Sequence, residues 1–176
     1  MAFDLAATTQ VLERTPAVLQ SWLGGLPDEW IQSREKPEGW NAFEIVGHLI
    51  HGEKTDWIPR MHGILKGGES AKFVPFDREG HGPNCLGKSM EELLGEFADL
   101  REQNLRELTS QQLSETQFAQ VGYHPDFGAV RMDHLLAAWA VHDLSHMAQI
   151  SRAMARHHRE AVGPWQAFMP IVGPRD

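Results

Sequence analysis

The sequence has one cysteine, Cys85, among its 176 residues. A lone cysteine excludes an internal disulfide and suits a protein of a reducing compartment. Residues 1–5 show no basic start followed by an apolar run, so no secretory signal peptide is evident. No uninterrupted apolar segment approaches the roughly 20 residues of a membrane span. We therefore expect a cytoplasmic protein with no membrane partner.

Basic residues are also scarce. The 16 lysines and arginines are outnumbered by 24 aspartates and glutamates, which gives a formal net charge of -8. A general nucleic-acid-binding protein would show a basic patch, so we expect no nucleic-acid partner. The sequence contains no nucleophile elbow, phosphate-binding loop or paired-cysteine motif. It has no period-two segment of any length, which argues against a sheet beyond a short pairing within a loop.

Apolar residues recur at helical spacing in four long stretches, and this periodicity predicts an all-α protein. The stretches cover about residues 5–26, 41–65, 89–108 and 132–159. Two of them begin with a capping-box pattern, Asn41 with Glu44 and Ser89 with Glu92. The length suits one domain, residues 1–176, and the four long helices predict a four-helix bundle.

Proline interrupts the first two stretches. Pro16 predicts that the first helix is kinked or restarts there, and Pro59 predicts a kink in the second helix. On the third stretch the charged residues, Arg101 among them, are expected to form a solvated face. After the fourth stretch, Phe168 and Met169 are expected to pack an apolar tail onto the bundle.

The connection between the second and third stretches, residues 67–88, is long and rich in glycine and proline. Extended at about 3.3 Å per residue, about 20 residues reach roughly 65 Å, whereas a helix of about 25 residues is near 37 Å long. The connection can therefore return along the bundle, so an up-down-down-up order is possible but not required. Its apolar centre, Phe73 to Phe76, is expected to pack near a metal site and help to shape a pocket.

The stretch from His142 to His146 carries the chemistry that stands out most in the sequence. On a helix this spacing places both imidazoles on one face, one turn apart, where both can reach one divalent metal ion. His48 is the better candidate for a third ligand, since it shares a face with apolar neighbours while His51 lies on a more polar face. The alternative is a pair of core histidines bonded to backbone or water. Imidazole suits zinc, copper, iron and nickel, so the residues leave the metal open.

Four further residues have two interpretations each. Asp143 either orients a ligand from outside the coordination sphere or is a plain acid on the helix surface. Glu53 either acts as a base near the metal or forms a salt bridge to a neighbouring helix. Tyr123 and His124 either reach the open side of the site from their loop or are solvated.

Two motifs resemble the DinB-like (DinB/YfiT) family of small helical-bundle metalloenzymes. Residues 40–49 read WNAFEIVGHL and resemble the family's helix-two motif, and residues 142–150 read HDLSHMAQI and resemble its final-helix motif. Residues 162–165, VGPW, are similar to the tail of one branch. The resemblance covers nearly the whole chain in order.

This resemblance implies an up-down-down-up four-helix bundle with one divalent metal ion, nickel or zinc, on the histidine triad His48, His142 and His146. It implies a metal-dependent enzyme with a small-molecule substrate. Related members include thiol-dependent isomerases and S-transferases, so the resemblance also implies a low-molecular-weight thiol cosubstrate. A homodimer is implied in the same way.

Two other functions stay open. One is a metal-dependent hydrolase, since His-Asp-x-x-His resembles the His-Glu-x-x-His pattern of zinc peptidases. The next downstream histidine, His157, would be about 16 Å from the pair on a continuous helix, which weakens the peptidase interpretation. The other is a stress-related metal-binding module without turnover. In each case metal affinity is expected to fall below about pH 6.5, where protons compete for imidazole.

Overall fold

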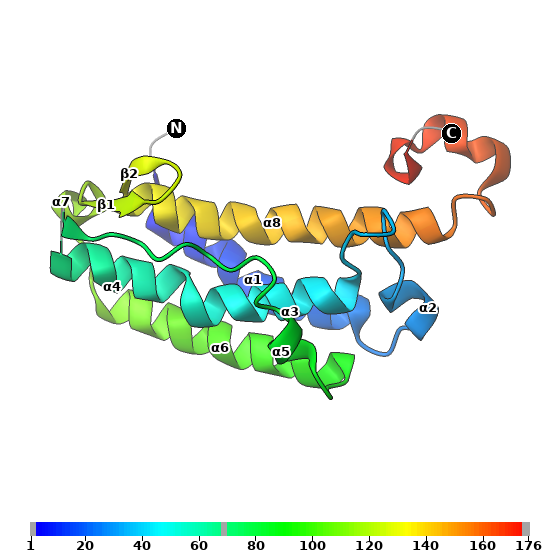
Figure 1. The fold of residues 1–176 in the computed structure, drawn as a ribbon, viewed down its shortest axis with the longest axis horizontal. Coiled ribbons are helices and arrows are strands. Elements are labelled where there is room, and N and C mark those ends of the chain that lie inside the picture. Colours follow the sequence, from blue (N-terminus) through cyan, green and yellow to red (C-terminus); the bar gives the residue numbers. More distant parts are fainter. Residues whose placement is uncertain (1–2, 68–69, 174–176) are drawn as a thin grey trace.

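The computed structural model of the protein describes residues 3–67 and 70–173. Figure 1 shows an elongated bundle of long helices with short elements at its two ends. The bundle helices are α1 (Leu5–Leu23), α3 (Ala42–Thr55), α4 (Trp57–Gly67), α6 (Met90–Ser110) and α8 (Met132–His157). Because α4 continues the direction of α3, the two together make the second long helix of a four-helix bundle.

The helix directions follow the up-down-down-up order. In Figure 1, α1 and α8 run one way, and α3 with α4 and α6 run the other way. Helix α6 packs against α1 and α3, and α8 packs against α1, α3 and α4. The segment after α4 returns along the outside of the bundle before α6 begins. The predicted fold and helix order are therefore confirmed, and α3 and α8 lie next to each other.

The short elements occupy the connections. They are α2 (Asp28–Ile31), α5 (Gly82–Cys85), α7 (Glu115–Phe118), the strands β1 (Val121–His124) and β2 (Gly128–Arg131), and the 3₁₀ helices η2 (Gly163–Phe168) and η3 (Pro170–Val172). The two strands form an antiparallel hairpin in which His124 pairs with Gly128. Within the described ranges this hairpin is the only sheet, as the absence of period-two segments predicted.

Both predicted capping boxes are present. In α3 the backbone N–H of Glu44 donates to the Asn41 side chain, and the backbone N–H of Asn41 donates to Glu44 Oε2, both at 2.9 Å. Ser89 and Glu92 bond in the same reciprocal way at the start of α6. Each box satisfies two N–H groups that a helix end leaves without intrahelical partners. The box at Asn41 thereby fixes where α3 starts.

Pro59 separates α3 from α4. Its ring would clash with the carbonyl four residues earlier, at Thr55, and it has no N–H to donate there. The helix breaks at Asp56, where φ is -111° and ψ is -71°. Pro59 consequently falls in the first turn of α4, where a missing N–H has no cost. The break places Asp56 at the junction of two helices.

Pro16 has a different outcome, because α1 continues through it from Leu5 to Leu23 and does not restart. A proline at this position leaves the carbonyl of Leu12 without its helical donor. Arg101 Nη1 on α6 donates to that carbonyl instead, at 2.8 Å. A side chain from a neighbouring helix thus replaces the lost backbone hydrogen bond.

Two expectations about exposure are wrong. Arg101, expected on the solvated face of its helix, is 1% exposed. Phe168, expected to pack onto the bundle, is 80% exposed, and Met169 is exposed as well. After α8 the chain turns at Gly163, whose φ is +56°, and the tail extends beyond the helix end in Figure 1. The tail residue that is buried is Val172, whose carbonyl accepts from Arg156 Nη1 at 2.9 Å.

The apolar core fills the space between the long helices. Trp139 of α8 is fully buried and Trp57 of α4 nearly so. Their rings stack with a centroid distance of 5.9 Å and so join α4 to α8. Across the described residues, no helix is both long and apolar enough to cross a membrane.

Candidate metal centre

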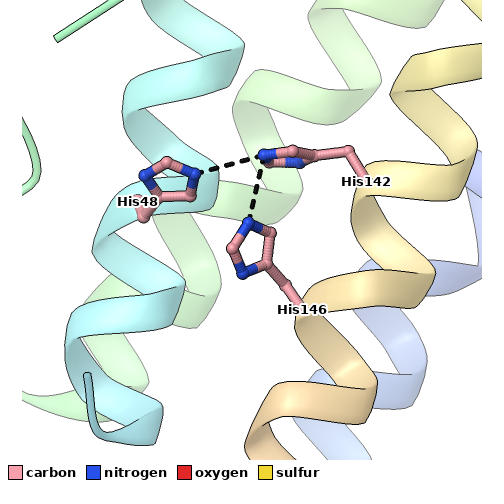
Figure 2. A group of neighbouring side chains, drawn as sticks. All are labelled: His48, His142 and His146. Carbon is pink, nitrogen blue, oxygen red and sulfur yellow. Dashed lines mark hydrogen bonds between the residues drawn. The ribbon is translucent and has the colours of Figure 1, made fainter. Parts of the chain in front are cut away.

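Three histidine side chains converge between α3 and α8. His48 comes from α3, and His142 and His146 come from successive turns of α8, so that all three rings enter the same space (Figure 2). The Nε2 atom of His142 lies 3.1 Å from Nε2 of His48 and 3.1 Å from Nε2 of His146. All three nitrogens lie within 4.8 Å of one another. The structure brings together the three residues that the sequence singled out.

The donor set fits a small divalent metal ion. Tetrahedral ligands at about 2.0–2.1 Å from zinc are separated from each other by about 3.3 Å. The two short nitrogen separations are close to this value. Three imidazoles also leave coordination positions open, as in catalytic rather than structural sites. The arrangement can therefore hold a metal ion that also contacts a substrate.

The surroundings of the histidines are largely aromatic. His48 is buried, and its ring lies 4.7 Å from Trp40 and 5.4 Å from Phe76. The half-buried ring of His142 meets Trp57 edge to face at 5.1 Å. These rings limit the access of water to the nitrogens, and the low polarity strengthens electrostatic interactions within the site.

Burial keeps the imidazoles neutral. It lowers the pKa of His48 to about 3 and that of His142 to about 2, and the neighbouring histidines lower both further. The pKa of His146 is also lowered, again chiefly by burial. A metal ion binds the neutral form. The expectation that metal affinity falls below about pH 6.5 assumed the ordinary pKa of histidine. Because burial lowers the pKa of these histidines, protons compete with the metal only at lower pH.

Gln149 fixes the proton position on one ligand. Its Oε1 lies 2.9 Å from Nδ1 of His146, so the neutral imidazole donates from Nδ1 and keeps the Nε2 lone pair for a metal. The Nδ1 atoms of His48 and His142 are buried without a hydrogen-bond partner in the described part of the chain. Gln149 could have been identified from the sequence, because it follows His146 by three residues on one helix and so lies on the same face.

A cavity of about 580 Å³ opens beside the three histidines. The segment after α4 forms one wall through Pro75 and Phe76, so this connection helps to shape a pocket as expected, but Val74 in its apolar centre is exposed. The tip of the β1–β2 hairpin contributes His124 and Phe127. Tyr123 does not line the cavity, whereas His124 does. Sequence reasoning missed several lining residues, Asp56 and Arg60 among them, because nothing in the local pattern marks them.

Both the sequence and the fold match known proteins. The sequence model of the DinB superfamily matches residues 11–150, which is most of the chain. The chain belongs to the DinB superfamily. A curated relative from Bacillus subtilis (strain 168), named "Putative metal-dependent hydrolase YfiT", is 25% identical over 157 residues, covering 84% of this chain and 82% of the relative.

The fold of this DinB superfamily member is also found in a solved structure of YfiT from Bacillus subtilis. That structure is described as "a probable metal-dependent hydrolase with an unusual four-helix bundle topology". It matches with a TM-score of 0.72 at 21% sequence identity and covers 89% of this chain and 87% of the other. At this identity the match shows that the two chains share the fold.

Two acidic candidates lie outside the cavity in this DinB superfamily chain. Glu53 forms the predicted salt bridge to another helix, because its Oε1 lies 2.8 Å from Arg101 Nη2. Asp143 is fully buried and binds Arg101 Nη1 and Nη2 at 2.7 and 3.0 Å. The interpretation of Asp143 as a surface acid is therefore wrong. Its hydrogen bonds run to Arg101 rather than to a histidine of the triad.

Arg101 links all four helices of the bundle. Its five N–H donors bind Glu53 of α3, Asp143 of α8 and the Leu12 carbonyl of α1. Burial alone would lower the pKa of Arg101, but Asp143 and Glu53 outweigh it and raise the pKa. Asn104 and Trp139 donate further hydrogen bonds to Glu53. We call these five side chains, Glu53, Arg101, Asn104, Trp139 and Asp143, the Arg101 cluster.

Two further histidines, His157 and His81, and Cys85 lie outside the cavity. His157, the candidate third ligand of a peptidase, packs against Trp30 with a ring distance of 5.6 Å and lies outside the triad. His81 is buried, and its ring packs at a tilt against Trp40, which itself packs against His48. Cys85 packs against α3, with its Sγ 3.8 Å from the carbonyl of Phe43, and does not line the cavity.

Proposed function

We propose that this protein is a metal-dependent enzyme in which His48, His142 and His146 bind one divalent ion, nickel or zinc, and a small-molecule substrate occupies the adjoining cavity. The observation that carries this proposal is the convergence of three Nε2 atoms at the wall of that cavity. The lowered pKa values support it, since neutral imidazoles are the form that binds metal.

The protein's own groups prepare the site. A bound metal would supply Lewis acidity there and lower the pKa of a water or thiol that it binds. Gln149 holds the proton on Nδ1 of His146 and so keeps the Nε2 lone pair directed into the site. Trp40, Trp57 and Phe76 exclude bulk water from the histidines.

We favour hydrolysis as the reaction class, supported by the name of the relative YfiT, which describes a metal-dependent hydrolase. A thiol-dependent S-transfer or isomerisation is the second candidate. The only internal thiol, Cys85, is outside the cavity, so this reaction would use an external low-molecular-weight thiol. A cavity of about 580 Å³ has room for a substrate beside such a cosubstrate.

Metal content separates the triad from the other histidines. We expect about one equivalent of metal in the parent protein and a large loss in His48→Ala, because two ligands from one helix hold a metal weakly. His51→Ala, on the same helix, and His157→Ala, on the same helix as the other two ligands, should keep the parent's content. Elemental analysis of the four proteins measures this, with circular dichroism to show that each is folded. Full metal occupancy in His48→Ala would refute the triad.

Turnover assays then separate the reaction classes. Metal-loaded protein is given ester and amide substrates with and without a low-molecular-weight thiol. Hydrolysis without thiol supports the first candidate, and product formation that requires the thiol supports the second. Metal binding with no turnover of either kind favours a binding module without catalysis.

A further inference from the structure

The cavity beside the histidines is much longer than a metal centre requires. His134 and His146 of α8 both line it, and at about 1.5 Å per residue these positions are roughly 18 Å apart along the helix. The histidine triad occupies one end. Between the ends, Trp57 and Ala138 give the lining apolar surface, and Asp56 lines the cavity beside Trp57. Arg60 and His124 line the other end.

Arg60 is held rigidly in the wall of the cavity. Its side chain is 11% exposed, and its Nε lies 2.6 Å from Asp56 Oδ1. Its Nη2 donates to the Val74 carbonyl at 3.3 Å, and its guanidinium lies over the Phe73 ring at 5.0 Å from the ring centre. A side chain fixed by three neighbours loses little further entropy when it binds a ligand.

Most donors of Arg60 are unused. A guanidinium has five N–H donors, and the contacts with Asp56 and Val74 account for two. Within residues 3–67 and 70–173 its other N–H groups have no acceptor. Arg101 shows the contrasting case, since all five of its donors are bonded inside the protein. Because the side chain of Arg60 lines the cavity, these N–H groups are open to an acceptor that enters it.

His124 adds a donor at the same end. Its Nδ1 accepts the backbone N–H of Asp126 at 3.1 Å, so a neutral His124 carries its proton on Nε2. Stacking on Phe127, at 4.4 Å between ring centres, fixes the orientation of the ring. Burial lowers the pKa of His124, and the charge of Arg60 lowers it more than Asp126 raises it. The charge of Arg60 therefore acts on the His124 ring, at an end of the cavity that Asp56 and Asp126 also line.

We propose that Arg60 and His124 form a binding subsite for a carboxylate group of the substrate. A carboxylate matches the planar donor fork of arginine and can accept two of its free N–H groups at once. The apolar surface between the ends of the cavity accommodates a hydrocarbon or aromatic body. The position of the reacting bond, at the histidine end, rests on the proposed function. The carboxylate subsite does not, because its residues are separate from the triad.

The test compares a carboxylate probe with its neutral isostere. Binding of 4-phenylbutyrate and 4-phenylbutyramide is measured by isothermal titration calorimetry at pH 7.5. We expect the parent to bind the carboxylate at least about tenfold more tightly than the amide, as charge-assisted hydrogen bonds are stronger than neutral ones. Arg60→Gln should abolish this preference. Arg60→Lys, which keeps the charge without the fork, should retain part of it.

Two further variants serve as controls. Arg106→Gln changes an exposed arginine that also pairs with a carboxylate four residues earlier, Glu102, and should keep the parent's preference. His48→Ala should keep it as well, which shows that the probe does not bind through a metal. Three results would overturn the subsite. They are loss of the preference in His48→Ala, persistence of the preference in Arg60→Gln, and failure of the parent to bind the carboxylate. Arg60→Gln should keep the parent's metal content, so that failure of the subsite can be distinguished from failure of the metal site.

Discussion

Two polar groups of residues lie inside the same helical bundle and differ in how far their hydrogen-bonding capacity is used. In the Arg101 cluster every guanidinium donor is bonded, and the partners come from three other helices. In the histidine triad, three ring nitrogens meet at one point, and the Nδ1 atoms of His48 and His142 have no partner in the described ranges. The two groups are neighbours, since Asp143 directly follows His142.

The difference separates structural roles from functional ones. A network whose donors and acceptors are all paired has nothing left to offer a ligand, and it holds α1, α3, α6 and α8 in a fixed arrangement. The Nε2 atoms of the triad contact only one another, at the wall of a cavity, so a metal ion can take the place of these contacts. The Arg101 cluster also carries two carboxylates for one guanidinium. This excess negative charge next to the triad favours a cation there.

Removing the centre of the Arg101 cluster should have the largest effect. Arg101→Met leaves two buried carboxylates without their counter-ion, and breaking a buried ion pair in this way typically costs about 3–5 kcal/mol. We expect a loss of at least about 3 kcal/mol in the free energy of unfolding, measured by urea denaturation. The matched control, Arg106→Met in an exposed pair, should lose less than about 1 kcal/mol. Equal losses in the two variants would contradict a structural role for the cluster.

Acid should destabilise the metal-free protein through the triad. The pKa values of His48 and His142 are lowered in the folded state, to about 3 and about 2. The unfolded chain takes up protons near pH 6.5, whereas the folded protein does not, so stability is full above that pH and falls as the pH decreases towards 3. The slope is up to about 1.4 kcal/mol per pH unit for each histidine.

Urea unfolding of chelator-treated protein at pH 7.5, 6.5 and 5.5 measures this slope. His48→Ala removes one of the titrating groups and should show a shallower dependence than the parent between the last two values. An unchanged slope in that variant would mean that the triad histidines are not the groups responsible.

Replacing Pro16 should have the smallest effect. A proline inside a helix usually costs about 3 kcal/mol, largely through the lost hydrogen bond and the clash with the preceding turn. Here Arg101 already satisfies the Leu12 carbonyl, so Pro16→Ala should stabilise the protein by less than about 1 kcal/mol. Thermal unfolding compares the variant with the parent. A gain close to 3 kcal/mol would show that the contact from Arg101 does not compensate for the proline.

Much of the fold and the triad follows from the sequence, because the signals are local. The capping boxes at Asn41 and Ser89 mark helix starts within four residues of sequence. The spacing of His142 and His146 places them on one helix face whatever surrounds the helix. His48 was distinguishable from His51 because its immediate neighbours on the helix are apolar.

Only the tertiary structure decided which groups the charged side chains bind. Periodicity assigns a charged residue to the surface unless its partner is known, and Arg101 finds its partners 42, 48 and 89 residues away in sequence. Arg60 likewise reaches the cavity only because Pro59 breaks the helix at Asp56 and the chain after α4 folds back to supply Val74. Local patterns in the sequence predicted the four long helical stretches and singled out the three histidines that meet. Long-range packing determined which charges are buried, because burial of a charge depends on groups that no local pattern records.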